Sequence, residues 1–259
     1  MAKGIYFGVN NKARKVKGMY FGVNNKARKV TKGYVGVGGK ARLFWETVIS
    51  MPLSELPERA IVNVNENGTK TPFYLAKHDY ESGLNGAGRD LYVRKDCYDA
   101  RAWSTGNNAY ANSSLDTWFN GDYKALFDEK IQEAMGTTTF YYTPGGNGAS
   151  MTVSTLARSV FALSTAELAL SNTYLNAEGS ALPIASTSQI AYLDGSAYSQ
   201  WTRSPKIDEY TRAGCVNNYG RSNYDYVYNA VGARPCFTLP STMLVGATPN
   251  ADGSYNLLI

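Results

Sequence analysis

The chain has 259 residues, enough for one large domain or for one domain and a small module. With 44% hydrophobic and 18% charged residues, its composition excludes a disordered or collagen-like protein. The cysteines Cys97, Cys215 and Cys236 lack metal-binding spacing, and the single histidine, His78, argues against histidine-based catalysis. We therefore expect no enzyme activity, no metal site and no cofactor.

The net charge of +5 is divided unevenly along the chain. Residues 1–45 contain eleven lysines and arginines and no acidic residue, which leaves 15 basic and 21 acidic residues, a formal −6, for the rest. A basic leader thus precedes a mildly acidic body. Nucleic-acid binding would be confined to the leader, and we do not expect a nucleic-acid partner.

The leader is an internal repeat with a period of 14 residues. It reads KGIYFGVNNKARKV, KGMYFGVNNKARKV and KGYVGVGGKARLFW, starting at Lys3, Lys17 and Lys32. The middle of each unit holds a residue pair that tolerates positive φ, Asn-Asn in the first two units and Gly38-Gly39 in the third. The pattern predicts one β-hairpin in each unit and a meander of short hairpins over residues 1–45.

The basic side chains of the repeats have two interpretations. They are the solvated faces and edges of short strands, or they form a docking surface for an acidic protein, nucleic acid or cell envelope. We favour solvated faces, because alternating lysine and arginine is typical of exposed strands. Since 45 residues bury little apolar surface alone, the leader is expected to pack on its own body, sister chains or another protein.

The segment 46–58 carries two prolines and is the predicted linker to a body over residues 59–259. The body begins with a predicted hairpin around Asn67-Gly68, and a strand over residues 91–93 follows. Next we expect a short helix that Ser114 caps and Gly121 ends, and a second helix that Asp122 caps.

The later part of the body is predicted to alternate short elements with long loops. A strand over residues 160–163 leads into Ser164–Glu167, a capping box that predicts a helix through Leu170. The segment 171–200 reads as loop, and a final hairpin pairs residues 243–245 with residues 255–259. Short strands with two or three small helices predict an α+β fold.

Seven short motifs follow one another in the body: LYVRK at 91–95, RAW at 101–103, NSS and WFN within 112–120, VFALS at 160–164, WTRSP at 201–205 and GARP at 232–235. Over residues 60–245 this order resembles an uncharacterised domain family of Gram-positive gut bacteria and their phages. That family is similar to the C-type-lectin fold in the variant shared with formylglycine-generating enzymes, so the resemblance implies a C-type-lectin-like body. The leader is similar to N-terminal repeats of phage and prophage structural proteins.

Four large side chains in these motifs are expected to be structural. Trp103 and Trp201 are predicted core residues rather than platforms for a ligand. Arg203 and Arg234 are predicted to be buried and to bind loop carbonyls or a carboxylate rather than a ligand.

The segment from Cys215 to Asn229 has an unusual composition, because ten of its fifteen residues are Asn, Tyr, Ser or Asp. Tyrosine offers a large, rigid contact area at low entropic cost, and Asn and Ser offer adaptable hydrogen bonds. We predict that this segment lines a ligand-contact surface, and the alternative is ordinary loop composition. The candidate binding residues are Tyr210, Asn217, Asn218, Tyr219, Arg221, Asn223, Tyr224, Asp225, Tyr226 and Tyr228.

The same four residue types are what an AAC codon encodes when its adenines are randomised. In this respect the segment resembles the varied C-terminal segment of retroelement-diversified phage receptor-binding proteins, which is displayed on a lectin fold. The resemblance implies that residues 207–229 are diversified by a retroelement. The alternative is that undiversified relatives also carry such residues here.

Catalytic interpretations find little support in the sequence. His78 lies at the end of a predicted strand beside Asp79, as a surface or capping histidine does. Cys215 and Cys236 lack the close spacing of the cysteines in formylglycine-generating enzymes, and the calcium-binding strings of true lectins do not occur. We assign no catalytic residue and no metal ligand.

The resulting functional hypothesis is receptor recognition by a phage or prophage virion protein of the tail fibre or tail tip. The partners would be a protein or glycan receptor on the host-cell surface and other virion proteins bound through residues 1–45. We expect a homo-oligomer, with the trimer usual for tail fibres, in the virion or in the bacterial cytoplasm before assembly. The chain start resembles no signal peptide, and no membrane insertion is expected. The alternatives are a structural or decoration protein without a receptor and an uncharacterised enzyme on the formylglycine-type scaffold.

Overall fold

The computed structural model describes residues 6–9, 12–15, 19–24, 26–30, 32–46, 49–148, 150–185 and 189–259. The chain divides into two compact units, residues 1–50 and residues 51–259, and each is described by itself. The boundary lies inside the predicted linker 46–58. The second half of that linker is part of the body, because a strand over Ser50–Pro52 joins its sheet and Leu53 and Leu56 are buried in its core.

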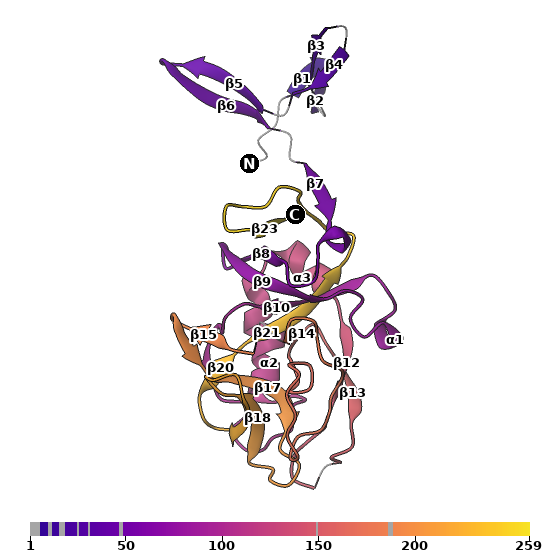
Figure 1. Ribbon diagram of the computed structural model, residues 1–259, viewed down its shortest axis with the longest axis vertical. Coiled ribbons are helices and arrows are strands. Elements are labelled where there is room, and N and C mark those ends of the chain that lie inside the picture. Colours follow the sequence, from indigo (N-terminus) through magenta and orange to yellow (C-terminus); the bar gives the residue numbers. More distant parts are fainter. Residues whose placement is uncertain are drawn as a thin grey trace. The chain divides into compact units, whose positions relative to one another are not determined.

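The first unit consists of antiparallel hairpins, one for each repeat (Figure 1). The third hairpin turns through Gly38 and Gly39, whose φ angles are +59° and +73° as a two-residue hairpin turn requires. Of the predicted turn residues, Asn24 has a φ of +50°, whereas Asn10, Asn11 and Asn25 lie outside the described residues. The strands are β1 (Tyr6–Val9), β2 (Lys12–Lys15), β3 (Tyr20–Val23), β4 (Lys26–Lys29), β5 (Lys32–Val37) and β6 (Lys40–Glu46).

These hairpins do not form one continuous meander. Each is a separate two-stranded sheet, and no ladder joins one hairpin to the next among the described strands. Lysine and arginine on the edge strands oppose edge-to-edge pairing, since such pairing would place like charges side by side. The hairpins leave six large apolar side chains exposed in the described part of this unit: Tyr20, Phe21, Val23, Tyr34, Val35 and Val37.

The body is built around an eight-stranded sheet. Its central strands β10 and β21 are buried along nearly their whole length, so both faces of the sheet are covered there. The sequence hairpin around Asn67-Gly68 is confirmed as β8 and β9, whose buried residues alternate along β8 as one packed sheet face requires. In spatial order the strands are β14 (Val160–Ala162), β21 (Pro235–Pro240), β10 (Arg89–Arg94), β9 (Thr69–Lys77), β8 (Ile61–Glu66), β23 (Tyr255–Leu258), β22 (Leu244–Gly246) and β7 (Ser50–Pro52).

Short helices pack on this sheet, with α3 against β21 (Figure 1). The predicted caps are corrected here: Ser113, not Ser114, caps α2, and the chain winds on through Gly121 and Asp122 instead of restarting. Burial of Phe119 and Tyr123 in the core favours this continuous winding. The helices are η1 (Leu53–Glu55), α1 (Ser82–Asn85), α2 (Ser114–Trp118), the π-helical turn η2 (Phe119–Tyr123), η3 (Lys124–Leu126) and α3 (Glu129–Met135).

A five-stranded sheet carries the C-terminal sequence motifs. Trp201 in β17 contacts Trp103 edge to face, with ring centroids 5.7 Å apart, and both are buried, which confirms their predicted core role. In spatial order the strands are β11 (Asp99–Arg101), β20 (Val231–Ala233), β17 (Gln200–Pro205), β18 (Arg212–Val216) and β19 (Ser222–Tyr226). Two further hairpins are formed by β12 (Thr138–Tyr142) with β13 (Ser154–Arg158) and by β15 (Ala191–Leu193) with β16 (Ser196–Tyr198).

The predicted α+β, C-type-lectin-like fold is wrong. Strands make up 41% and helices 12% of the structure, so the fold is β-rich. The Ser164–Glu167 capping box forms both of its reciprocal hydrogen bonds, yet a turn with Ala169 at φ +54° follows in place of a helix. The segment 171–200, predicted as loop, contains the β15–β16 hairpin, which turns through Asp194 and Gly195.

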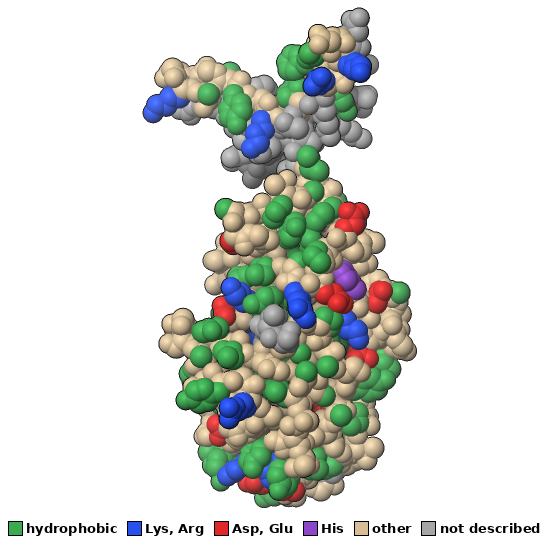
Figure 2. Space-filling model, viewed as in Figure 1, with side chains coloured by type: hydrophobic (Ala, Val, Ile, Leu, Met, Phe, Trp, Pro, Cys, Tyr) green, Lys and Arg blue, Asp and Glu red, His purple; other side chains and the backbone are tan. Residues whose placement is uncertain are grey.

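Charged side chains are mixed over the face of the body in Figure 2, where acidic and basic groups are interspersed. Neither sign gathers into one large patch in that view. In the described part of the chain, no helix is long and apolar enough to cross a membrane.

Candidate functional site

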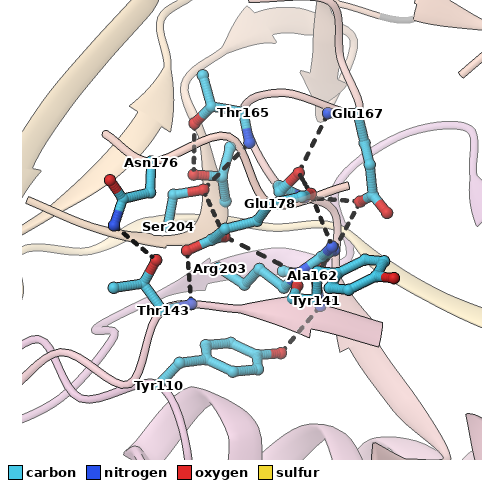
Figure 3. Close-up of polar contacts among 12 residues, drawn as sticks. Tyr110, Tyr141, Thr143, Ala162, Thr165, Glu167, Asn176, Glu178, Arg203 and Ser204 are labelled. Carbon is cyan, nitrogen blue, oxygen red and sulfur yellow. Dashed lines mark hydrogen bonds and ion pairs between the residues drawn. The ribbon is translucent and has the colours of Figure 1, made fainter. Parts of the chain in front are cut away.

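A network of polar contacts surrounds Arg203, which is fully buried in β17 (Figure 3). Its Nη1 donates to Glu167 Oε2 at 2.6 Å and to the carbonyl of Ala162 at 3.0 Å, and its Nε donates to the carbonyl of Tyr141 at 2.8 Å. The Tyr80 hydroxyl donates to the other oxygen of Glu167 at 2.5 Å. This network confirms that Arg203 binds a carboxylate. The carbonyls of Tyr141 and Ala162 belong to strands β12 and β14, and Nη2 also donates to the loop carbonyl of Glu178 at 3.3 Å.

A second carboxylate, that of Glu178, is fully buried beside Arg203. It accepts hydrogen bonds from the Thr143 amide and from the Ser204 hydroxyl, both at 2.8 Å. Burial raises the pKa of Glu178 to about 7, although Arg203 acts in the opposite direction. Since these charged groups are shielded from solvent, their arrangement anchors the 163–178 segment to β17 and offers no surface to a ligand.

Arg234 has a similar structural role. Its Nε donates to the carbonyl of Arg94 at 2.8 Å, and its Nη1 donates to Gln200 Oε1 at 3.1 Å. This confirms that Arg234 is buried and binds a backbone carbonyl, which belongs to the end of strand β10 and not to a loop. The two sequence motifs are therefore structural: WTRSP lies in β17 of the five-stranded sheet, and GARP leads from β20 of that sheet into β21 of the eight-stranded sheet.

Most of the predicted binding residues belong to the hairpin of β18 and β19 and to the turn between them. Tyr224 and Tyr226 are two residues apart in β19, so their side chains lie on the same face of the sheet. Arg212 stands opposite Tyr226 on the neighbouring strand, and Gly214 stands opposite Tyr224.

On this face, aromatic rings and cations alternate. The Lys206 ammonium lies 4.7 Å from the ring centroid of Tyr174 and 4.9 Å from that of Tyr224. The Arg212 guanidinium follows, 5.6 Å from the Tyr224 ring and 4.2 Å from the Tyr226 ring. The ring of Tyr228 ends the series: it stacks on the ring of Tyr226, and the two ring centroids are 5.2 Å apart. We call this series, Tyr174, Lys206, Tyr224, Arg212, Tyr226 and Tyr228, the tyrosine ladder.

Acidic side chains balance the two cations of the ladder. Lys206 forms an ion pair with Asp208, and Glu209 lies 3.5 Å from Lys206 and 3.2 Å from Arg212. Burial lowers the pKa of Lys206, but the neighbouring Asp208 and Glu209 raise it more, so the ammonium remains charged. Cation–π contacts of this kind hold the tyrosine rings in defined positions.

Two residues outside the predicted set position the ladder. The buried side chain of Asn108 donates to the carbonyls of Lys206 at 2.9 Å and Arg212 at 2.7 Å, which holds both ends of the 206–212 loop. Gly214 leaves room for the loop that carries Tyr174, because a Cβ atom there would lie 2.9 Å from Leu175 Cδ1.

The turn between β18 and β19 presents the remaining predicted residues. Asn217 Oδ1 accepts hydrogen bonds from the amides of Tyr219 and Arg221, both at 3.0 Å, so Asn217 shapes the turn. Tyr219 is 76% exposed, and Asn218 and Arg221 are exposed as well. The turn therefore displays a tyrosine on a backbone that is already ordered.

Asn223 and Asp225 point to the opposite face of β19 from the ladder, because residues alternate along a strand. Asp225 Oδ1 accepts hydrogen bonds from the Tyr226 amide and from Asn229 Nδ2, both at 2.8 Å, so this side chain holds the local backbone conformation. Asp225 and Asn218 also line an open cavity with Tyr198. The structure thus divides the predicted residues between two faces and a turn, instead of bringing them to one site.

Tyr210 lies in the loop before β18 and is exposed. Its carbonyl accepts a hydrogen bond from the Asn108 amide at 2.8 Å. Sequence reasoning missed Tyr174, Lys206 and Arg212. The charged string KIDEYTR at 206–212, directly before the tyrosine-rich segment, was the signal that could have indicated the last two.

His78 contacts the body core rather than a catalytic group. Its Nδ1 lies 3.0 Å from Asp90 Oδ2, and its Nε2 lies 2.8 Å from the carbonyl of Leu56. Burial lowers the pKa of His78, but these two acceptors together raise it more. Cys97, Cys215 and Cys236 are free and buried, and the described residues hold no cluster of His, Cys, Asp and Glu that could bind a metal ion.

Comparisons with known proteins give one match. The profile of a family described as "Domain of unknown function (DUF6273)" matches residues 87–241, which is more than half of the chain and includes Arg203, Asn108 and the whole tyrosine ladder. Neither the curated proteins nor the solved structures contain a match to this chain. By the extent of the profile match, the chain belongs to the DUF6273 family.

Proposed function

We propose that the body recognises a receptor on a host-cell surface and that the protein is a tail-fibre or tail-tip component of a phage or prophage virion. The observation that carries the proposal is the tyrosine ladder, in which rings and cations fix one another before any ligand arrives. A pre-organised surface of this kind binds without the entropic cost of ordering its side chains.

The outer end of the ladder is the expected point of contact. Tyr228 is 60% exposed, and its ring stacks on that of Tyr226 with an interplanar angle of 13°. The two rings offer apolar area, and their hydroxyls offer hydrogen bonds. This combination suits a receptor that has both apolar and polar groups.

The N-terminal hairpins support the virion part of the proposal. Isolated two-stranded hairpins are marginal in water, and those of this protein expose Tyr20, Phe21 and Tyr34. Contacts with sister chains or with other virion proteins would cover these rings. Such assembly displays several bodies together, so weak single sites combine into strong attachment.

Retroelement diversification, as part of this proposal, predicts a particular pattern of variation. Asn217 and Asp225 hold the backbone through side-chain hydrogen bonds and are expected to be invariant, whereas Asn218, Tyr219 and Asn223 are exposed and free to vary. Sequencing of the locus from several isolates tests this. A reverse-transcriptase gene and a template repeat that differs only at adenines are expected, and their absence would reject diversification without touching receptor binding.

The test of recognition uses fluorescently labelled full-length protein and intact cells of a panel of Gram-positive bacteria, analysed by flow cytometry. We expect the native protein to bind at least one strain. The double variant Tyr226→Ala with Tyr228→Ala should bind that strain at least tenfold more weakly, because it removes the outer rings of the ladder.

Leu244→Ala is the matched control, since Leu244 is an exposed apolar residue of β22, outside the ladder. This variant should bind as the native protein does. The melting temperature of every variant should lie within about 3 °C of the native value, which corresponds to a change of about 1 kcal/mol in the free energy of unfolding for a chain of this size. Absence of binding to every strain, or equal binding by the double variant, would contradict the proposal and favour a structural particle protein.

A further inference from the structure

A second surface of the body has the features of a ligand site, and it lies where the β18–β19 turn meets the β15–β16 hairpin. A cavity of about 280 Å³ opens there, lined by residues of β9, β15, that turn and the segment after β10. An adjoining cavity of about 370 Å³ shares Lys95, Asp96 and Tyr192 with the first. We call the two together the Tyr192 groove. The first cavity is lined by Tyr74, Lys95, Asp96, Gln189, Ile190, Tyr192, Tyr219 and Gly220.

The aromatic lining of the groove is exposed, and the turn that carries Tyr219 has an ordered backbone. Tyr192 is 45% exposed and Tyr219 is 76% exposed. The backbone around Tyr219 is held by Asn217, and the turn packs closely on Ile190, because a Cβ atom at Gly220 would lie 3.1 Å from Ile190 Cγ1. Two tyrosine rings thus border the same cavity from different hairpins.

Two adjacent charged residues, Lys95 and Asp96, line the same cavity. Their backbone is anchored, since the Lys95 amide donates to the Pro72 carbonyl at 3.0 Å and Arg94 Nη1 donates to the Asp96 carbonyl at 2.8 Å. Within the described ranges of the chain, neither side chain has a hydrogen-bond or ion-pair partner. An ammonium and a carboxylate on a rigid backbone are therefore available to a ligand in the groove.

We propose that the Tyr192 groove binds a neutral oligosaccharide. The tyrosine rings suit the apolar C–H face of a pyranose, the Asp96 carboxylate accepts hydrogen bonds from hydroxyl groups, and the Lys95 ammonium donates to ring and hydroxyl oxygens. Two joined cavities around Tyr192 suit at least two consecutive sugar rings.

The charges of the groove favour a neutral ligand over an ionic one. The second cavity adds Asp194 and Arg94, and Arg94 is paired with Glu66 at 3.0 Å, so the groove holds charges of both signs without an excess of cations. A phosphate-rich polymer would face Asp96 and Asp194, and a polycation would face Lys95. The inference goes beyond the proposed function: it concerns a separate groove that shares only Tyr219 and Gly220 with the tyrosine-rich segment, and its test needs no cells.

The test uses full-length protein and a panel of neutral hexasaccharides built from glucose, N-acetylglucosamine, mannose, galactose or rhamnose, with binding measured by calorimetry. We expect at least one of them to bind with a Kd of about 1 mM or lower. Tyr192→Ala and Asp96→Asn should each weaken that binding at least tenfold. Tyr192→Phe should retain it within about threefold, because the ring face and not the hydroxyl makes the contact.

The double variant Tyr226→Ala with Tyr228→Ala is the control, since it alters the ladder and leaves the groove intact; its saccharide affinity should be native. If Tyr192→Ala unfolds the protein, Tyr219→Ala replaces it, because that side chain is largely solvated. The inference is overturned if no hexasaccharide gives saturable binding at about 10 mM, or if the groove variants bind as the native protein does. Saccharide binding without cell binding would support the groove and contradict the proposed function, and cell binding without saccharide binding would do the reverse.

Discussion

Glu178 shows how one residue couples the stability of this protein to pH. Its carboxyl group is fully buried, and burial raises its pKa from the ordinary 4.5 to about 7, despite the nearby Arg203. Between these two pH values the folded protein binds a proton that the unfolded chain has released. The stabilisation is therefore fully present below about pH 4.5 and is lost as the pH rises through 7.

We predict that Glu178→Gln makes the melting temperature less dependent on pH between 5 and 8. The amide keeps the shape of the side chain and carries no charge to bury, so it removes a cost of about 3 kcal/mol at most at the alkaline end. Calorimetric melting of both proteins at several pH values measures the difference. The pKa of His78 is also raised, but His78 is present in both proteins, so its contribution to the pH dependence cancels in the comparison. Parallel pH profiles would show that Glu178 titrates normally.

Close packing around Gly232 leaves no room for a side chain at this position. A Cβ atom at this position of β20 would lie 2.5 Å from Cys97 Sγ and 2.7 Å from the carbonyl oxygen of Ser199. The close approach brings β20 against the start of β17, where the Gly232 amide donates to the Ser199 carbonyl at 2.9 Å.

We predict that Gly232→Ala lowers the free energy of unfolding by about 1–3 kcal/mol, the usual cost of overpacking. Denaturant titration measures it. Gly121→Ala is the matched control, because no atom lies within 4 Å of a Cβ built at Gly121 and its position is helical. An equal loss in both variants would mean that the general properties of glycine, and not this contact, are responsible.

At the scale of the element, the start of α2 shows how a local signal is displaced by one residue. Both Ser113 and Ser114 are chemically able to cap the helix, and the sequence favoured Ser114. In the structure Ser113 Oγ accepts from the Asp116 amide at 3.1 Å, while Ser114 is the first helical residue and is exposed. The Arg158 contact with Asp116 at 2.9 Å, made from β13, holds the helix start in this register.

We therefore predict that Ser113→Ala destabilises the protein by about 1 kcal/mol, as loss of an N-cap does. Ser114→Ala should change the stability by less than about 0.5 kcal/mol, as an exposed substitution does. Thermal unfolding of the two alanine variants decides between the registers. A larger effect at Ser114 would place the cap where the sequence pattern had indicated it.

The hairpins show which elements could be recognised from sequence. Asn67-Gly68 and Gly38-Gly39 specify a two-residue turn by backbone conformation alone, so the hairpins around them could be recognised without knowledge of the fold. The Asp194-Gly195 turn carried the same signal and was overlooked inside a polar segment. The Ser164–Glu167 capping box formed its bonds without a helix, because Glu167 also binds Arg203.

At the scale of the whole molecule, the body contains its own core and its own sheets. Its edge strand β7 begins at Ser50, and the Leu53 amide donates a hydrogen bond to the Met243 carbonyl at 2.8 Å. The chain is therefore part of the sheet of the body from Ser50 onward. The leader hairpins form ladders only within themselves among the described strands.

We predict that deletion of residues 1–49 leaves the melting temperature of the body within about 2 °C of the native value. Proteins that fold as independent domains retain their stability when a neighbour is removed. Light scattering on both forms should show a lower oligomeric state after the deletion if the hairpins assemble the chain. A large loss of stability would instead show that the leader completes the core of the body.

The sequence by itself determined the features that depend on neighbouring residues: the repeat period, the turn pairs, the division of charge between leader and body, and the core role of the tryptophans. Only the tertiary structure decided the β-rich fold and the division of the tyrosine-rich segment between the ladder, the turn and the opposite face. The contact of Lys206 with Tyr174 joins residues 32 positions apart, and the cavity lined by both Tyr192 and Tyr219 joins residues 27 positions apart. No local pattern encodes them, because they arise when separate hairpins pack together.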